Sequence, residues 1–207
     1  MNPDILYTME KTTLPKAEFL LGKDVTRIAR NLLGKRIVVN SRGVERSGII
    51  IETEAYAGIH DRASHAYGGR YTGRTQTMYR QGGTCYVYLC YGIHKLFNIV
   101  TGPEGRPDAV LIRGVLRERE GKIVLGPGRT SRELGIELSH NGEELGGKIR
   151  LEEAPFNIPA TWVLKGPRIG IDYAGRDKFL PYRFFIGPEK LKTLILTLNS
   201  INPKNHK

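Results

Sequence analysis

The sequence contains little cysteine, and its cysteines are poorly placed for cross-linking. Two occur in 207 residues, Cys85 and Cys90. Both fall in one expected strand at an odd separation, so their side chains should point to opposite faces and cannot bridge each other. No CxxC pair and no Cys/His ligand spacing is present. We therefore predict no structural disulfide, no metal site and no cofactor.

Long apolar runs and a signal sequence are also lacking. No window approaches the apolar length needed to cross a bilayer, and the N-terminus has no signal-peptide pattern. These absences predict a soluble, cytoplasmic protein with no membrane partner.

Acidic residues are scarce as well, because 21 Asp and Glu stand against 32 Lys and Arg, a formal net charge of +11. This excess of base indicates a polyanionic partner such as nucleic acid.

Length and glycine content indicate the fold class. A chain of 207 residues suffices for one well-buried domain, and its 25 glycines indicate many tight turns. We predict a flexible arm over residues 1–16, one α+β domain over 17–200 and a basic tail over 201–207. The domain should contain a curved mixed or antiparallel β-sheet, a protruding β-hairpin and surrounding helices.

The apolar stretch 48–56 predicts a buried strand that carries acids. Its three consecutive isoleucines suit a pleated sheet. Because strand side chains alternate, Glu52, Glu54 and Tyr56 should lie in line with Ile50, and the opposite face should hold Ile49, Ile51, Thr53 and Ala55. A carboxylate is costly to bury unless it is paired or takes part in chemistry. Judged on this strand alone, a salt-bridged structural pair is the favoured interpretation.

Several other elements follow from local patterns. The stretch 108–113 predicts a buried strand that ends in Arg113, which can neutralise Glu52 or Glu54. The glycine-rich start of a short helix at Gly126-Pro127-Gly128 can bind phosphate through backbone amides. The remaining expected elements are a helix over 25–32 capped by Asp24 and stopped by Gly34, a hairpin that joins 35–39 to the isoleucine strand through a turn at 41–43, a charged turn at 117–122, and short strands at 162–164, 168–171 and 182–186.

A long loop and a hairpin carry most of the binding chemistry. The loop over 58–81 contains two histidines, several arginines and three tyrosines, and a loop of this length in a compact domain is typically functional. His60 and His65 lack a recognisable metal-ligand spacing. Two strands flank a turn at Tyr91-Gly92, with Tyr86 and Tyr88 on one face. A tyrosine at a solvated tip suits a wedge between base steps or a stacking platform.

Taken together, these motifs resemble one family. The resemblance covers residues 17–187 in order, and it is to the alkyladenine (3-methyladenine) DNA glycosylases of the human type. It rests on Glu52-Thr53-Glu54-Ala55-Tyr56, His65 with Gly68-Gly69-Arg70, Tyr86-Val87-Tyr88 with Tyr91-Gly92, Asn98, Leu111-Ile112-Arg113 and Gly126-Pro127-Gly128. The chain departs from the family in a short segment between Arg113 and Gly126, and at Gly73 and Thr75, where proline and asparagine are common.

The resemblance implies a monofunctional enzyme that flips an alkylated or deaminated purine out of duplex DNA and hydrolyses its N-glycosidic bond, which starts base excision repair. It implies that Glu54 activates the attacking water and that Arg113 helps to hold it. Tyr91 resembles the residue that fills the gap in the base stack. The implied base pocket is Tyr56, His65, Tyr88, Asn98 and Leu111, with Asn98 crowding the amino group of normal guanine, and the implied DNA contacts are Arg70, Arg74, Tyr86 and Lys95.

Two other hypotheses stay open at this stage. A bifunctional glycosylase/lyase would need an amine nucleophile, and Lys95 is the candidate, although a phosphate contact suits this lysine better. A non-catalytic lesion-binding or RNA-binding protein would keep the aromatic residues and the positive charge, but would have no need of Glu54 beside Arg113. We expect a monomer, because scanning along DNA requires no symmetry.

Overall fold

The computed structural model describes residues 18–154 and 156–201. The expected arm over 1–16 lies outside the described residues. So does the expected basic tail except for Ile201, which is the last residue of a helix. No described helix is long and apolar enough to span a membrane.

The described residues form a nine-stranded sheet in which every recorded strand pair is antiparallel. The strand order is β3-β4-β5-β2-β1-β7, while β6 pairs with β5, β9 with β2, and β8 with β9. This confirms the expected α+β class with a curved sheet and a protruding hairpin. The strands are β1 (Arg36–Ser41), β2 (Val44–Tyr56), β3 (Cys85–Cys90), β4 (His94–Thr101), β5 (Asp108–Arg117), β6 (Lys122–Leu125), β7 (Ile149–Glu152), β8 (Val163–Gly166) and β9 (Arg183–Ile186).

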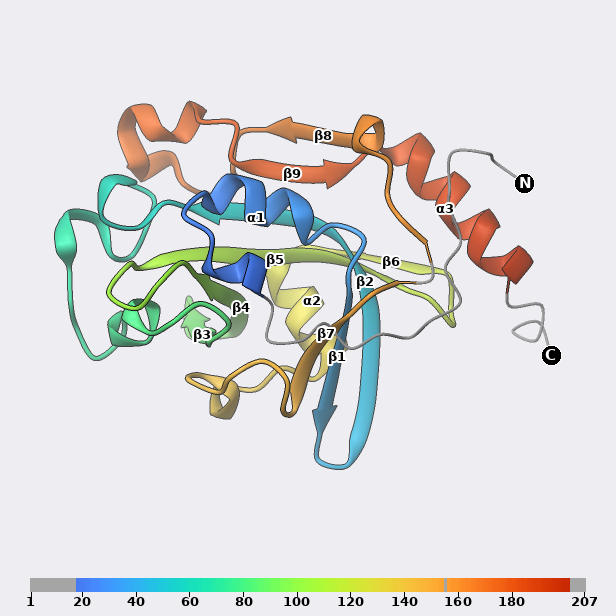
Figure 1. Cartoon of the computed structure of the whole chain (residues 1–207), viewed down its shortest axis with the longest axis horizontal. Helices are drawn as coiled ribbons and strands as arrows, with labels where there is room; N and C mark the ends of the chain where they lie inside the picture. Colours follow the sequence, from blue (N-terminus) through green and yellow to red (C-terminus); the bar gives the residue numbers. More distant parts are fainter. Residues whose placement is uncertain (1–17, 155, 202–207) are drawn as a thin grey trace.

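Three α-helices and several short segments of 3-10 helix surround the sheet in the described part of the chain (Figure 1). Asp24 caps the first helix, where its carboxylate accepts hydrogen bonds from the N–H groups of Thr26 and Arg27, as the sequence predicted. The α-helices are α1 (Val25–Asn31), α2 (Pro127–Leu134) and α3 (Pro188–Ile201). The 3-10 segments are Glu18–Leu21, Gly58–His60, Tyr67–Gly69, Gln76–Tyr79, Leu138–His140, Ala160–Trp162 and Asp172–Phe179.

Strand β2 is the centre of the sheet. Its first half pairs with β1, its second half pairs with β9, and β5 lies along its other edge. A turn at Arg42-Gly43, both with positive φ, closes the expected β1–β2 hairpin. One apolar cluster packs α1 and α2 against the sheet, and a second packs α3 against it through Leu191, Leu194 and Leu198.

The alternation expected for β2 is wrong, because an irregularity interrupts the strand. Pairing with β5 shifts between Ile50 and Glu52, and again between Glu52 and Thr53, so that Ile51 on β2 and Arg113 on β5 have no partner in the register. Ile49 and Ile51 therefore join the cluster under α3. Thr53 instead donates a 2.8 Å hydrogen bond to the carbonyl of Ala29 in α1, and Ala55 lies in the cluster that contains α1.

Two further expectations are corrected. The strand that should end at Arg113 continues to Arg117, since β6 pairs with its second half after the charged turn. Residues 168–171 are not a strand: Gly170 has φ +76°, and the N–H of Ile169 donates to Glu54 rather than to a neighbouring strand. Helix α3 and strands β6 and β7 were not predicted.

Candidate active site

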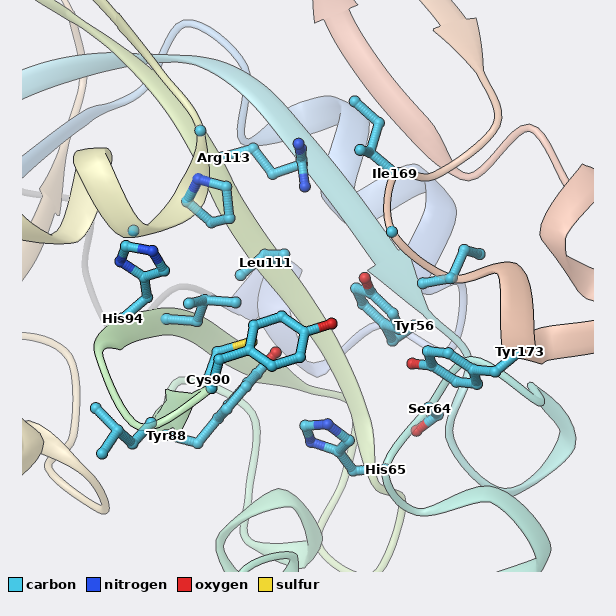
Figure 2. A pocket seen from close by; sticks show the side chains of 18 of the residues that line it. Tyr56, Ser64, His65, Tyr88, Cys90, His94, Leu111, Arg113, Ile169 and Tyr173 are labelled. Carbon is cyan, nitrogen blue, oxygen red and sulfur yellow. The ribbon is translucent and has the colours of Figure 1, made fainter.

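A cleft of about 1090 Å³ opens beside the C-terminal half of β2 (Figure 2). This volume is slightly above the range typical of small-molecule sites. Its walls come from β2, β5, the β3–β4 hairpin, the start of α2, the loop after β2 and the segment after β8. The residues that line it include Tyr56, His65, Arg70, Arg74, Tyr88, Tyr91, His94, Leu96, Leu111, Arg113, Arg129, Ile169 and Tyr173.

Glu54 is completely buried directly behind this wall. Its Oε1 accepts a 2.8 Å hydrogen bond from the N–H of Ile169, and its Oε2 accepts one of 2.8 Å from the hydroxyl of Tyr56. Burial raises the pKa of Glu54 above its ordinary value, against the lowering effects of Arg113 and of these two hydrogen bonds. Arg113 thus acts in the expected direction, but burial outweighs it. The result is a stronger base than an exposed glutamate.

Arg113 is held at its Nε. This atom donates a 3.1 Å hydrogen bond to Oε1 of Glu52 and lies 3.4 Å from Oε1 of Glu54. No described residue accepts a hydrogen bond from its two terminal nitrogens. Figure 2 shows the side chain extending from β5 towards Ile169, above the ring of Tyr56. Arg113 thus lies in the cleft wall at the point where the pairing of β5 with β2 is interrupted.

Tyr56 is supported from behind by a buried guanidinium. The Cζ of Arg168 lies 4.8 Å from the centre of the Tyr56 ring, and Arg168 forms a bidentate ion pair with Asp61. Asp61 also accepts hydrogen bonds from the N–H groups of Ala57 and Ala63, which fixes the loop that follows β2. Burial and the neighbouring Glu54 raise the pKa of Tyr56, so its hydroxyl stays protonated and donates to Glu54.

His65 contacts two tyrosines and an arginine. Its Nε2 lies 3.4 Å from Nη2 of Arg74, and because a guanidinium can only donate, Nδ1 carries the hydrogen and donates to the hydroxyl of Tyr86 at 2.9 Å. Its ring meets that of Tyr88 edge-on at 4.6 Å. Burial, with Arg74 and Arg70 nearby, lowers the pKa of His65 to about 4. The imidazole is therefore neutral at physiological pH.

Asn98 lies deeper, in a small cavity of about 30 Å³ that shares Tyr56, His65 and Tyr88 with the main cleft. It is nearly buried, and its Nδ2 donates to the carbonyl of Tyr86 at 3.2 Å. The amide is thus fixed against the backbone of β3, and it lines this cavity together with the three aromatic residues.

Tyr91 occupies the tip of the hairpin, as predicted. Its side chain is 90% exposed and its φ is +51°, a conformation that residues other than glycine rarely adopt. The neighbouring Ile93 is 71% exposed. Two large apolar side chains thus project into solvent beside the mouth of the cleft.

The structure brings most of the predicted site residues together, and Lys95 is the exception. Tyr56, His65, Arg70, Arg74, Tyr88, Tyr91, Leu111 and Arg113 line the cleft, Glu54 lies behind it, and Tyr86 and Asn98 line the adjoining cavity. Lys95 directly precedes Leu96 on β4, so the two side chains point to opposite faces of the strand. Leu96 lines the cleft, whereas the ammonium group of Lys95 forms an ion pair with Glu137. Its predicted DNA contact stays a prediction.

Sequence reasoning missed several residues of the site. Ile169 contributes only its backbone N–H, and no side-chain pattern could have shown this. Tyr173 lines the cleft, and its hydroxyl donates to the carbonyl of Ala63 at 3.1 Å. His94 packs against Gly128, where a β-carbon would lie 3.0 Å from the imidazole Cγ. The Gly-Pro-Gly motif was the available signal for this last contact.

The described residues contain no group of three or more His, Cys, Asp and Glu side chains that could hold a metal ion. The arrangement offers a buried carboxylate, a guanidinium and several aromatic rings around one cleft. Such a site can receive a flat, electron-poor ring and activate water beside it. These features fit a hydrolase that receives a planar nucleobase.

Comparison with known proteins identifies the family. The sequence model for methylpurine-DNA glycosylase matches residues 19–190. A protein of Chlamydia felis is 40% identical over 196 residues, which cover 87% of this chain and all of that protein. One of Desulfitobacterium hafniense is 39% identical over 187 residues, which cover 80% and 91% of the two chains. Both relatives bear the provisional name 3-methyladenine DNA glycosylase. The chain belongs to the methylpurine-DNA glycosylase family, whose members are DNA-repair hydrolases that bind DNA.

Proposed function

We propose that this protein is a monofunctional DNA glycosylase that flips alkylated or deaminated purines out of duplex DNA and hydrolyses their N-glycosidic bond with water activated by Glu54. The observation that carries the proposal is the place of Glu54, fully buried behind Tyr56 and Arg113 at the wall of an aromatic cleft. A carboxylate offers roughly four lone-pair positions. Ile169 and Tyr56 take two of them, and Arg113 is only adjacent, which leaves room for a water.

The chemistry follows from this position. The water oxygen attacks C1′ of the deoxyribose while Glu54 accepts the proton of the water. The electron pair of the N-glycosidic bond leaves with the base, and the carboxylate stabilises the oxocarbenium character at C1′. A cationic alkylated purine departs as a neutral base and needs no proton, so this substrate class suits the site best.

Neutral aromatic walls favour such a substrate. The rings of Tyr56, His65 and Tyr88 offer electron-rich faces to a cationic purine. Because the pKa of His65 is about 4, its imidazole does not repel the positive charge at neutral pH. Asn98 at the cavity floor crowds an exocyclic amino group, which disfavours normal guanine.

The hairpin tip supplies what flipping requires. Extrusion of a base costs a few kcal/mol, and an inserted aromatic side chain recovers part of that cost by stacking. Tyr91 is exposed and lies next to the cleft, so it can fill the space that the base leaves. Arg70 and Arg74 beside the mouth suit contacts to phosphates or to the flanking strand.

The alternatives fit less well. A lyase mechanism needs an amine at C1′, whereas Lys95 lies on the other face of β4 in an ion pair with Glu137. A non-catalytic binder gains nothing from a fully buried carboxylate, whose desolvation is costly. We therefore propose hydrolysis by water, and neither a lyase reaction nor binding alone, carried out by a monomeric enzyme.

The test measures base release from two duplexes, one carrying hypoxanthine and one carrying alkylated purines, by wild type and by Glu54→Gln. We expect wild type alone to produce abasic sites, while both proteins bind lesion DNA. The matched control is Glu118→Gln, which loses a half-buried ion pair with Arg36 outside the cleft. Release by Glu54→Gln at the wild-type rate would refute the assigned role. Binding without any release by wild type would favour the non-catalytic binder.

A further inference from the structure

Glu52, two residues before Glu54 on β2, is the only residue whose side chain accepts a described hydrogen bond from Arg113. The carboxylate of Glu52 is 7% exposed, and its Oε1 receives Nε of Arg113 at 3.1 Å. The distance from the same Nε to Glu54 is longer, 3.4 Å. Arg113 is thus anchored to Glu52 and only adjacent to Glu54.

A second guanidinium balances the charge of Glu52. Nη1 of Arg183 on β9 lies 3.6 Å from Oε1 of Glu52, and the Arg183 side chain stacks on the ring of Phe185 at 4.6 Å. In the register, β9 places Phe185 opposite Glu52 and Arg183 opposite Glu54. Two carboxylates and two guanidiniums therefore form one cluster with no formal excess of charge, in which only Arg183 is partly exposed.

The anchoring has a geometric consequence. Since Nε is the atom that is held, neither terminal nitrogen of Arg113 has an accepting partner among the described residues, and the side chain lines the cleft. Without Glu52, the guanidinium could turn its terminal nitrogens onto Glu54 and form the bidentate pair that carboxylates favour. That pair would occupy the lone-pair position that the water needs.

We propose that Glu52 is a positioning residue for the glycosylase reaction: with Arg183 as its counter-charge, it holds Arg113 by Nε and keeps it from closing on Glu54. This inference rests on the proposed role of Glu54. It assigns the first acid of the Glu-Thr-Glu motif to Arg113 and the second to the water.

The cluster also sets the charge that Glu54 senses. Glu52 repels a negative charge on Glu54 and contributes to the raised pKa of Glu54, whereas Arg113 opposes it. Removal of the Glu52 charge should therefore lower that pKa, and removal of the Arg183 charge should raise it. The titratable and charged groups that face Glu54 are Glu52 and Tyr56 on β2, Arg113 on β5, Arg183 on β9, Arg168 before Ile169, and Tyr173.

The experiment measures single-turnover release of an alkylated purine from pH 5 to 9 by wild type, Glu52→Gln, Glu52→Ala and Arg183→Gln. The titration of the substrate is common to all four proteins and cancels. We expect the acidic limb of the profile to move to lower pH in Glu52→Gln and to higher pH in Arg183→Gln. Glu52→Ala should lose about 100-fold in rate, the scale of a misplaced catalytic geometry, with lesion binding retained. Glu52→Gln keeps an acceptor oxygen and should lose less.

A purely structural Glu52 gives a different result. The folded fraction of Glu52→Ala would then release bases at the wild-type rate on the plateau of its pH profile, as we expect for the control Glu118→Gln, and this outcome would overturn the proposal. If Glu52→Ala does not fold, the rate of Glu52→Gln on the plateau of its pH profile decides the question: a rate below that of Glu118→Gln supports the proposal, and an equal rate overturns it. Activity in Glu54→Gln would instead refute the proposed function, so the two failures are distinguishable.

Discussion

Arg168 and Asp61 form an ion pair whose side chains are 0% and 1% exposed. The guanidinium also donates to the carbonyl of Ala55 at 2.8 Å, and its Cζ lies 4.8 Å from the centre of the Tyr56 ring. The pair thus joins the end of β2, the loop after it and the segment that carries Ile169. It holds together the two sides of the wall behind which Glu54 is buried.

We predict that Asp61→Asn destabilises the protein by about 3–5 kcal/mol, because it leaves a buried guanidinium without its counter-charge. Urea unfolding measures the change. The control is Glu189→Gln in α3, which removes an exposed ion pair with Lys192 and should cost less than about 1 kcal/mol. Equal effects of the two substitutions would show that the Arg168–Asp61 pair contributes no more to the free energy of unfolding than an exposed ion pair.

A second prediction concerns acid stability. The pKa of His65 is about 4 in the folded protein against 6.5 for an ordinary histidine. Between these values the unfolded chain binds a proton that the folded protein does not, so stability is complete above pH 6.5 and is lost as the pH falls towards 4. The loss is on the order of 3 kcal/mol. Urea unfolding at pH 7 and pH 4 should show a smaller loss for His65→Gln than for wild type.

The control for this prediction is His60→Gln, which removes an exposed histidine of the same loop. It should follow wild type across the pH range. If His65→Gln also follows wild type, the neutral state assigned to His65 in the cleft is wrong.

Local patterns explain what the sequence could predict. The hairpin turn at Tyr91-Gly92 and the cap at Asp24 each depend on residues a few positions apart, and both are confirmed. The line of Glu52, Glu54 and Tyr56 followed from alternation. It holds although the pairing of β2 with β5 shifts on both sides of Glu52, since Arg113 lies near both carboxylates and Tyr56 donates to Glu54. The spacing of Leu191, Leu194 and Leu198 also contained the signal for α3, which was overlooked.

Pairing between distant strands explains what could not be predicted. Ile49 and Ile51 lie on the opposite face of the sheet from Thr53, and this arrangement depends on how β5 pairs with β2. The alternating apolar residues of 168–171 favour a strand, but there the backbone of Ile169 donates to Glu54 and Arg168 is drawn to Asp61. These are tertiary contacts between segments more than 100 residues apart, so no local pattern contains them.

A third prediction separates function from stability at the hairpin tip. Tyr91 makes little contact and has a positive φ that glycine adopts without strain. Tyr91→Gly should therefore leave the free energy of unfolding within about 1 kcal/mol of wild type. Base release under single-turnover conditions should fall, because no ring fills the gap in the stack. Leu196→Ala, at a 69% exposed apolar residue of α3, should change neither quantity. Undiminished release by Tyr91→Gly would remove Tyr91 from the flipping step.

A fourth prediction uses the close approach of Gly114 to Glu52. A β-carbon at Gly114 would lie 3.1 Å from the β-carbon of Glu52 and 3.0 Å from Cδ2 of Leu125, so Gly114→Ala must displace one of them. Gly48→Ala is a matched control on the same sheet, since its β-carbon would lie 3.0 Å from that of Val115. Both substitutions should cost about 1–3 kcal/mol of unfolding free energy through overpacking. Only Gly114→Ala disturbs the residue that holds Arg113, so only this variant should also release bases more slowly per folded molecule. Equal rates in the two variants would show that the packing around Glu52 tolerates the shift without loss of the Arg113 geometry.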